Sequence, residues 1–476
     1  MTFAVEKTDI VARVQALLGP KGATLGPEME RYLVDWRGTQ RGDALLVARP
    51  ATTDEVAALV RVCNELGYTI HVQGGNTSLC QGSVPGATAT GILLSTERMN
   101  KIIEIDTVSN TLAVQCGVVL STLHDAVAKE GRKFPLSLGA EGTAQIGGLV
   151  ATNAGGVAAL RYGSMRQMVL GLEVVLPDGS VVRRMAALQK DNRGLDWKQL
   201  FIGSEGTLGI ITEVALKLYP QTHKRVTALL AIPNIDSAST CFMQLNERFD
   251  TALSACELMN RSQIELAIAH VSGTKWPMAD LPAYSLLFEL SDSNSERDFT
   301  EESERSLVSM IESGLVADAV IAQNGREVDD LWHLRHACPE ANKLGGCAIM
   351  FDVSVRLSRL SSFLEDAESA ASGAAPQGRA VFMGHLGDGN VHWNWMLPPE
   401  TNQATEMPMI KSVRDAVNAV LVKHDGSFSA EHGIGRKHVG DLEASLPEAE
   451  MNLMRGLKNA LDPHNLLSPG IILGSR

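Results

Sequence analysis

The sequence QGGNTSL at residues 73–79 directly follows a predicted strand at residues 68–72. Glycine allows a positive φ and a close approach of the backbone to a ligand, and successive N–H groups can then point into one concavity. Such a concavity suits a pyrophosphate, and the hydroxyl groups of Thr77 and Ser78 add hydrogen-bond donors. By itself this loop is equally compatible with an ordinary turn, because a short glycine-rich motif has low specificity.

Two further clusters of small residues favour a ligand site. One reads PLSLGAEGTAQIGG at residues 135–148 and continues as ATNAGG at residues 151–156, and the other reads GSEGTLGIIT at residues 203–212. Such runs fit backbone that lies against a large flat ligand, although close packing between elements would also require them. No strand is followed at once by G-x-G-x-x-G and a helix, so a Rossmann nucleotide-binding domain lacks its signature.

The segments around these clusters predict helices mixed with antiparallel hairpins. Residues 52–67 are expected to form a helix that begins at a capping box, Thr52 with Glu55, and ends at a glycine. Strand–turn–strand patterns occur at residues 102–116 and 172–184. This combination indicates the α+β fold class.

Changes in pattern along the chain predict its division into parts. A boundary is expected near residues 219–220, after which apolar strands alternate with polar helices. The end of the chain is expected to be mostly helical around a glycine-rich loop at residues 426–435. We therefore predict an α+β domain at residues 1–220, a second α+β domain at residues 221–404 and a helical segment at residues 405–476.

Composition excludes several classes of protein. The 476 residues are 45% hydrophobic and 20% charged, which excludes an intrinsically disordered chain. The 55 acidic residues outnumber the 42 basic ones, and the formal net charge of -13 argues against a nucleic-acid partner. The 7 dispersed cysteines lack a C-x-x-C motif, so we expect reduced thiols and no iron–sulfur cluster.

The location of the protein is inferred from the absence of apolar runs. No segment approaches the roughly 18 apolar residues that a transmembrane helix needs. Glu6 and Asp9 interrupt the apolar pattern at the N-terminus, which indicates an amphipathic helix rather than a signal peptide. We therefore expect a cytoplasmic protein without a transmembrane segment.

The sequence GHLGDGNVHWNW at residues 384–395 predicts a hairpin that carries two histidines. Asp-Gly between alternating residues favours a two-residue type I′ turn. With that turn His385 lies directly opposite His392, with Cβ atoms about 4.5–5.5 Å apart, and Asn394 shares their face. Two imidazoles so placed can bind one divalent cation, although a purely structural histidine pair is the alternative.

A second motif, SAEHGIG at residues 429–435, places a carboxylate beside an imidazole. Two histidines and Glu431 would form a set that leaves metal positions open for substrate, which is the catalytic arrangement. His432 would then remain available as a base. The alternative is a helix-capping glutamate with an incidental histidine.

The first half of the chain resembles the FAD-binding domain of the vanillyl-alcohol oxidase / p-cresol methylhydroxylase superfamily. The resemblance rests on the three glycine clusters in their order, on RYGS at residues 161–164 and on LGLEVVLPDG at residues 170–179. It implies FAD, with the first cluster at the pyrophosphate and the later clusters along the ribityl chain and the isoalloxazine. The residues that the resemblance assigns to FAD are Gly74, Gly75, Asn76, Thr77, Ser78, Gly82, Gly142, Thr143, Gly147, Asn153, Gly155, Glu205, Gly209 and Ile211.

Two features of the first half concern how FAD would be held. Gln73 stands where the superfamily often has arginine. A covalent flavin link is not implied, and we interpret His71, a strand histidine beside the loop, as structural.

The second half resembles the C-terminal domain of FAD-linked 2-hydroxyacid dehydrogenases, the D-lactate, glycolate and D-2-hydroxyglutarate dehydrogenase group. This resemblance implies a ferredoxin-like α+β substrate domain and a helical C-terminal segment. It also implies a divalent metal on His385, His392 and Glu431, for which zinc is favoured over manganese or cobalt. His432 would be the base and contact the substrate, and Arg335 and Asn394 would bind the substrate.

Departures from this group bear on the substrate. Pro339, Met350 and Ser468 stand where the group has threonine, lysine and asparagine, respectively. Positive charge for a distal carboxylate is therefore reduced, and Lys343, Arg356 or Lys437 could compensate.

The resemblance predicts FAD-dependent oxidation of a D-2-hydroxyacid, such as D-2-hydroxyglutarate or D-lactate, to the 2-oxoacid, with hydride transfer to flavin N5. The FAD would be bound non-covalently. The electron acceptor would be an electron-transfer flavoprotein, a quinone or a cytochrome, and a homodimer or peripheral contact with the inner membrane is compatible with the sequence. Two alternatives are a flavin oxidase that uses O2 and a non-catalytic FAD-binding subunit of a glycolate-oxidase-like complex. Such a subunit would not need His385, His392, Glu431 and His432 together.

Overall fold

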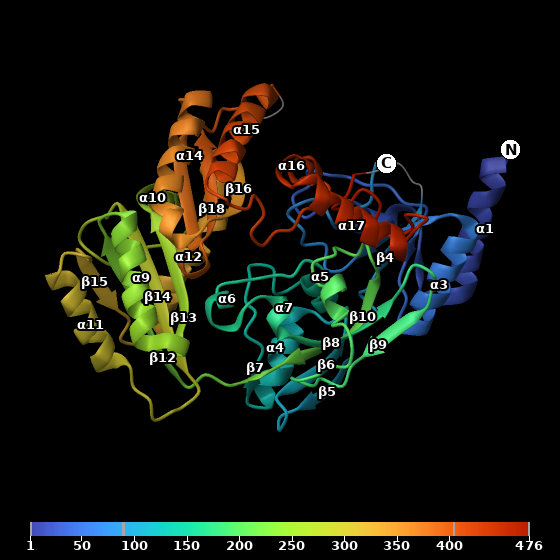
Figure 1. The fold of residues 1–476 in the computed structure, drawn as a ribbon, viewed down its shortest axis with the longest axis horizontal. Coiled ribbons are helices and arrows are strands. Elements are labelled where there is room, and N and C mark those ends of the chain that lie inside the picture. Colours follow the sequence, from blue (N-terminus) through green and yellow to red (C-terminus); the bar gives the residue numbers. More distant parts are fainter. Residues whose placement is uncertain (1, 88–90, 403–404, 475–476) are drawn as a thin grey trace. The chain divides into compact units, whose positions relative to one another are not determined.

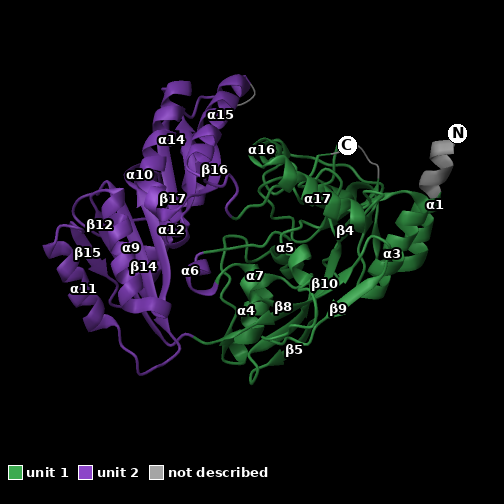
Figure 2. Ribbon diagram, in the orientation of Figure 1, with its two compact units in different colours: residues 1–156, 163–221, 431–476 green, residues 157–162, 222–430 purple. Residues whose placement is uncertain are grey.

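The computed structural model describes residues 2–87, 91–402 and 405–474 (Figure 1). The chain forms two compact units (Figure 2). Unit 1 comprises residues 1–156, 163–221 and 431–476, and unit 2 comprises residues 157–162 and 222–430. Within these described ranges, no helix combines the length and the apolar character needed to cross a membrane.

The first sheet of unit 1 ends at the QGGNTSL loop. Its order is β1-β2-β4-β3, and β3 lies parallel to β4, which lies parallel to β2. The bounds are β1 Ala23–Thr24, β2 Val47–Ala48, β3 Thr69–Gln73 and β4 Gly91–Ser95.

Helix α3 (Thr53–Leu66) precedes β3 and has the ends that the sequence predicts. The Thr52 side chain accepts a hydrogen bond from the Glu55 N–H, and Glu55 accepts one from the Ala51 N–H. Gly67 ends the helix in the left-handed conformation at φ 72°. These local contacts confirm the predicted helix, and the chain continues from it into β3.

The second sheet of unit 1 is antiparallel, in the order β5-β6-β10-β8-β9. Both predicted hairpins are present, as β5 with β6 and as β8 with β9. Strand β10, which follows the third glycine cluster, separates the two hairpins. The bounds are β5 Ile102–Asp106, β6 Thr111–Gln115, β8 Val169–Val175, β9 Val181–Arg184 and β10 Ile210–Lys217.

The other elements of unit 1 are helices and one short strand pair. Strand β7 (Arg132–Lys133) pairs with β11 (Tyr219–Pro220). The helices are α1 Thr2–Leu18, α2 Glu30–Leu33, α4 Leu120–Lys129, α5 Ile146–Ala151, α7 Met165–Met168, α8 Lys198–Phe201, α16 Val439–Ser445 and α17 Glu448–Leu461, with the 3-10 turn η1 Gly26–Met29. The side chain of Glu6, which the sequence analysis used for α1, lies outside the described side chains.

Unit 2 is built on a seven-stranded antiparallel sheet in the order β15-β12-β14-β13-β17-β18-β16. The predicted α+β class is confirmed, with a larger sheet than the ferredoxin-like one that the resemblance implied. The bounds are β12 Lys224–Ile232, β13 Leu253–Asn260, β14 Tyr284–Asp292, β15 Asp318–Ile321, β16 Cys347–Ser354, β17 Arg379–His385 and β18 Asn390–Leu397.

Helices cover both faces of this sheet. One face packs on α9 (Ile235–Phe249), α11 (Thr300–Glu312), α14 (Leu360–Ala374) and α15 (Met407–Lys423). The other packs on α10 (Arg261–His270), α12 (Gly325–His336) and α13 (Cys338–Leu344). Helix α6 (Ala159–Tyr162) and the 3-10 turns η2 Asp250–Ala252, η3 Leu357–Arg359 and η4 Leu386–Asp388 complete unit 2.

The segment at residues 405–476 is divided between the two units. Its first part, including α15, belongs to unit 2, because Ile410, Val413 and Val417 pack into the core of that sheet. Its second part belongs to unit 1, where Leu466 and Leu467 join the core. The helical segment predicted at residues 405–476 is therefore not one separate part, because its apolar residues pack into the cores of two different units.

Candidate active site

The hairpin of β17 and β18 has a different register from the predicted one. His385 lies opposite Asn390, and Met383 lies opposite His392. The predicted two-residue turn is wrong, because η4 and Gly389 (φ 74°) form a four-residue connection. Tertiary contacts hold this wider turn: Val355 N–H donates to Gly389 O, and the η4 residue Leu386 is buried in the core.

His385 and His392 nevertheless share one face of the sheet. Residues directly opposite in an antiparallel pair lie on the same face, and so do alternate residues of one strand. The two rings are 5.5 Å apart between centroids and meet edge to face. Asn394 follows on the same face, where it is buried and its Nδ2 donates to Val381 O at 3.1 Å.

A buried carboxylate joins His385 to Arg335. Glu257 of β13 lies opposite His385, and its Oε1 is 2.7 Å from His385 Nδ1. Its Oε2 accepts a hydrogen bond of 2.7 Å from Nε of Arg335 on α12. Glu257 is 0% exposed and Arg335 is 5% exposed. The sequence analysis missed Glu257, although a glutamate inside the strand SACELMN signals a buried partner, because a buried charge requires one.

Glu257 stays ionised in this environment. Burial by itself would raise the pKa of the carboxyl, but the adjacent His385 and Arg335 outweigh it and lower the pKa of Glu257 to about 2. An ionised carboxylate only accepts hydrogen bonds, so Nδ1 of His385 carries the proton in this contact.

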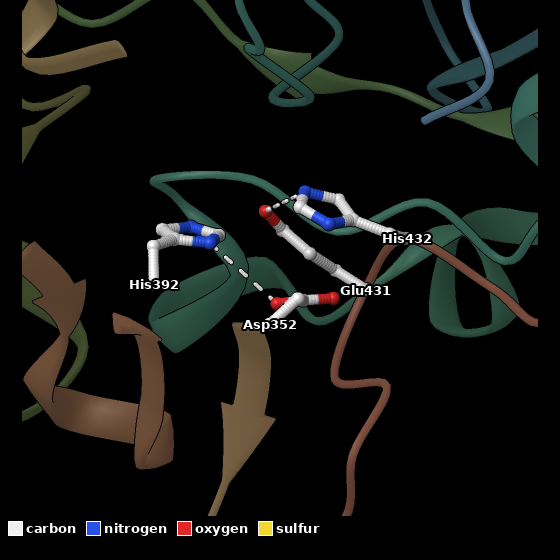
Figure 3. A group of neighbouring side chains, drawn as sticks. All are labelled: Asp352, His392, Glu431 and His432. Atoms are coloured by element: carbon white, nitrogen blue, oxygen red, sulfur yellow. Dashed lines mark ion pairs between the residues drawn. The ribbon is translucent and has the colours of Figure 1, made fainter. Parts of the chain in front are cut away.

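Four side chains form a group of possible metal ligands: Asp352, His392, Glu431 and His432 (Figure 3). One ligand atom from each lies within 4.8 Å of the others. Asp352 Oδ1 is 3.5 Å from His392 Nδ1, and the same oxygen accepts a hydrogen bond from Asn390. Asp352 was not among the predicted site residues, although its place in the alternating strand FDVS, opposite His392, brings it to this face.

Glu431 and His432 directly follow Ala430, which is hydrogen-bonded to β16. The N–H of Ala430 donates to Asp352 O at 3.1 Å, and Ser427 and Ser354 exchange two backbone hydrogen bonds. Glu431 Oε1 is 3.8 Å from His432 Nε2, and both side chains are partly exposed. His438, another histidine that follows the loop, is engaged by Asp441 at 2.8 Å, through Nδ1.

Glu205 anchors the same loop within unit 1. Its carboxylate accepts hydrogen bonds of 2.8 Å from the N–H groups of Ile434 and Gly435. Gly435 has φ 56°, and a Cβ there would lie 1.9 Å from Cys80 O. Burial raises the pKa of Glu205, and the two N–H groups oppose that rise. The residue expected to contact FAD thus holds the loop that follows Glu431 and His432.

Some of the predicted cofactor glycines are required by packing alone. A Cβ on Gly75 would lie 2.0 Å from Thr143 O, one on Gly147 2.6 Å from the Cβ of Cys116, and one on Gly209 2.6 Å from Val174 Cγ1. At Gly75 and Gly147 the glycine clusters of unit 1 pack closely against Thr143 and Cys116, respectively. For these positions the structure favours close packing, the second explanation that the sequence left open.

The surroundings of other predicted cofactor glycines are less crowded. Gly142 is exposed and has no positive φ, and a Cβ added to it would have no described neighbour within 4 Å. Gly74 meets its nearest neighbour, Gly148, at an ordinary 3.4 Å. Gly82 and Gly155 lie next to the carboxylates of Glu205 and Glu431, at 3.2 and 3.4 Å. Open backbone around Gly142, beside exposed Thr143, fits a ligand that lies against it.

Polar side chains of the first cluster shape its loop. Asn76 has φ 57°, donates to Val34 O and accepts from Ser83. Ser78 Oγ accepts from the N–H groups of Cys80 and Gly82. These bonds hold the turn that the neighbouring glycines allow.

Three further residues of unit 1 have structural partners. Gln73 donates to Tyr32 O and Ser83 O at 2.8 Å. These bonds hold the start of the QGGNTSL loop, at the position where the superfamily often has arginine. Asn153 accepts from Ser164 Oγ and from the Arg166 N–H. Ile211 is part of the hydrophobic core.

Comparison with known proteins identifies the family. The sequence profile of the C-terminal domain of FAD linked oxidases matches residues 221–472, and that of an FAD binding domain matches residues 44–184. The chain belongs to the FAD-linked oxidases. The expected resemblance is confirmed, and this FAD-linked oxidase chain is an oxidoreductase that binds FAD.

Relatives of this FAD-linked oxidase align over nearly its whole length. The mitochondrial D-2-hydroxyglutarate dehydrogenase of Bos taurus is 38% identical over 469 residues, which cover 98% of this chain and 84% of the bovine protein. The D-2-hydroxyglutarate dehydrogenase of Xanthomonas citri pv. viticola is 35% identical over 461 residues, which cover 97% and 96% of the two chains.

Solved structures share the fold. p-Cresol methylhydroxylase superposes with a TM-score of 0.76 at 18% identity, over 99% of this chain and 97% of that one. 4-Ethylphenol oxidase from Gulosibacter chungangensis has a TM-score of 0.74 at 18% identity, over 99% and 98% of the two chains. At this identity the likeness establishes the fold of the FAD-linked oxidase.

The two kinds of glycine should respond differently to substitution. Gly142→Val should leave the thermal unfolding of the FAD-free protein unchanged and weaken FAD binding by about tenfold or more, because the added side chain would occupy the open space beside backbone that the resemblance assigns to FAD. Gly75→Ala should lower the unfolding temperature without FAD, since its Cβ meets backbone. Flavin-fluorescence titration and thermal unfolding would measure both effects. Normal FAD affinity in Gly142→Val would contradict the assignment of this loop to the cofactor.

Proposed function

We propose that this chain oxidises a D-2-hydroxyacid to the 2-oxoacid, with non-covalently bound FAD, one divalent metal ion and His432 as the base. The observation that carries the proposal is the cluster of His392, Glu431, His432 and Asp352 on an FAD-linked oxidase chain. The names of the bovine and Xanthomonas relatives support the substrate class.

The proposed metal ligands are His385, His392 and Glu431, of which His392 and Glu431 belong to the cluster of possible ligands with Asp352 and His432, whereas His385 lies outside that cluster. The Nδ1 atoms of the two histidines face carboxylates, at 2.7 Å from Glu257 and 3.5 Å from Asp352. Metal-binding histidines commonly use one ring nitrogen for such a carboxylate and the other for the metal. Two imidazoles and one carboxylate favour zinc, with manganese and cobalt as alternatives, and leave positions open for substrate.

The oxidation removes a proton from the substrate hydroxyl and a hydride from Cα, and the proposed roles give each of them an acceptor. When bound, the metal would lower the pKa of the substrate hydroxyl, and FAD would accept the hydride from Cα. His432 takes the hydroxyl proton, because imidazole, with a reference pKa of about 6.5, can accept a proton at neutral pH. Arg335 and Asn394 are the proposed contacts to the substrate, and the Arg335 guanidinium is already oriented by Glu257.

The surroundings of His71 support non-covalent FAD. His71 is buried, with its Nε2 3.1 Å from Gly82 O. Burial, with a smaller effect of Arg436, lowers the pKa of His71 to about 3. A neutral, hydrogen-bonded strand histidine fits a structural role.

Metal dependence is the direct test of the proposal. D-2-Hydroxyacids should bleach the flavin without O2 and reduce an acceptor dye, and a chelator should abolish both reactions until Zn²⁺ or Mn²⁺ is returned. Elemental analysis should find one metal ion in the wild-type protein and a loss of it in His392→Ala, while the exposed-histidine control His464→Ala retains it. Full activity in the presence of the chelator, or unchanged metal in His392→Ala, would refute the metal site. Faster reoxidation by O2 than by the dye would favour the oxidase alternative.

Removal of the proposed base should slow the chemical step selectively. His432→Gln should retain FAD and metal while kcat falls by about 10²–10⁴-fold, the usual range for a lost acid–base group. His438→Gln is the matched control, since His438 is engaged by Asp441, and it should keep most of the activity. Stopped-flow flavin reduction across pH would measure this. A near-normal rate with an unaltered pH profile in His432→Gln would assign the base elsewhere.

The position of Met350 predicts the preferred substrate. In the sheet, the row Met350, Asn394 and Val381 lies two residues from the row that contains Asp352 and His392. A substrate side chain extending along this face would meet Met350 where the dehydrogenase group has a cation. We therefore expect a weaker demand for a second carboxylate than in a strict D-2-hydroxyglutarate enzyme.

Exchange of Met350 tests this preference. Met350→Lys should raise kcat/KM for D-2-hydroxyglutarate relative to D-lactate by about tenfold, because a charge-assisted hydrogen bond to the distal carboxylate contributes roughly 1.5–3 kcal/mol. Met350→Leu, which keeps the apolar character, should leave the ratio unchanged. An equal ratio in the lysine and leucine variants would place the distal carboxylate away from Met350.

A further inference from the structure

The buried carboxylate of Glu257 bonds to both Arg335 and His385. It reaches them across the sequence, 78 residues from Arg335 and 128 residues from His385. All three belong to unit 2, on the sheet face covered by α10, α12 and α13. The two hydrogen bonds use different oxygens of one carboxylate, so the orientation of one partner constrains the other.

This arrangement is energetically demanding. A buried, unpaired carboxylate is strongly destabilising, whereas a buried pair with good geometry can balance its desolvation. Glu257 is 0% exposed, and each of its oxygens has a donor at 2.7 Å. A purely structural position would be filled more simply by an apolar residue, as in the neighbouring residues Leu258 and Met259 of the same strand.

We propose that Glu257 is a positioning residue that couples the metal ligand His385 to the substrate-binding Arg335. It accepts a hydrogen bond from His385 Nδ1, so that Nε2 is the nitrogen that would bind the metal, and it fixes the plane of the Arg335 guanidinium. The inference rests on the proposed function, because it requires both the metal and the substrate contact.

The coupling gives the two partners of Glu257 opposite effects on the metal. Removal of the carboxylate takes away a negative charge and the acceptor that orients His385, so metal binding weakens. Removal of Arg335 takes away a positive charge and leaves the whole carboxylate to His385, so metal binding strengthens. A packing role alone would weaken metal binding in both cases.

Glu289 provides a matched control. It lies on the neighbouring strand β14 and also bonds to helix α12, through Trp332 Nε1 at 2.9 Å. It is partly buried and pairs with Arg225 at 3.4 Å. Glu289→Gln therefore alters a second carboxylate that supports the same helix through Trp332 rather than through Arg335.

The experiment uses the full-length protein with FAD, freed of metal by a chelator and titrated with Zn²⁺ against a chromophoric chelator. Glu257→Gln should weaken Zn²⁺ binding by about 10–100-fold, the usual effect of losing such a carboxylate. It should also raise KM for the 2-hydroxyacid, whereas Glu289→Gln should change neither quantity. Arg335→Met should bind Zn²⁺ more tightly than the wild type while its KM rises.

Each outcome decides the inference. Wild-type Zn²⁺ affinity in Glu257→Gln, or weaker binding in Arg335→Met, would overturn the coupling. If Glu257→Gln does not fold, the direction of the change in Arg335→Met decides alone. A wild-type protein that binds no stoichiometric Zn²⁺, Mn²⁺ or Co²⁺ would instead overturn the metal in the proposed function.

Discussion

The antiparallel register of β16, β18 and β17 is the constraint on which the candidate site depends. It places Asp352 opposite His392 and, two residues further along, Ser354 and His385 opposite Asn390. The side-chain period of a strand is two, so a shift of one residue would turn every one of these groups to the other face. There they would face the apolar core of α9, α14 and α15.

Backbone hydrogen bonds hold both ends of the EHGIG loop. Ser354, Ser427 and the Asp352–Ala430 bond hold its approach along β16. Within unit 1, Glu205 holds the N–H groups of Ile434 and Gly435. The positive φ of Gly433 and Gly435 allows the tight path between. Glu431 and His432, the proposed active-site residues of this loop, therefore lie between anchored neighbours.

The glycines of the three clusters are small for two different physical reasons. Gly75, Gly147 and Gly209 are small because other protein atoms occupy the space of a side chain. Gly142 is small without such a neighbour. Both kinds occur in an FAD-binding domain, since a loop that approaches a ligand must itself be supported by closely packed backbone. The same fold in p-cresol methylhydroxylase shows that this scaffold tolerates extensive change in sequence.

The sequence by itself determined the local elements and the motifs. Helix α3 followed from its caps, and the hairpins β5–β6 and β8–β9 from alternation and turn residues. The shared face of His385 and His392 was predicted from a two-residue turn that the structure replaces with a wider one. These features depend on residues a few positions apart, where propensity and spacing act directly.

Only the tertiary structure decided which distant residues meet. The insertion of β10 between β6 and β8 and the contact of Glu205 with the loop at Ile434 join remote segments. The four-residue turn before β18 is held by a hydrogen bond from the remote residue Val355. The bonds of Glu257 to Arg335 and His385 do so as well. Periodicity reports the face on which a side chain lies but not its partner on another strand or helix, because that partner is selected by the packing of the whole sheet.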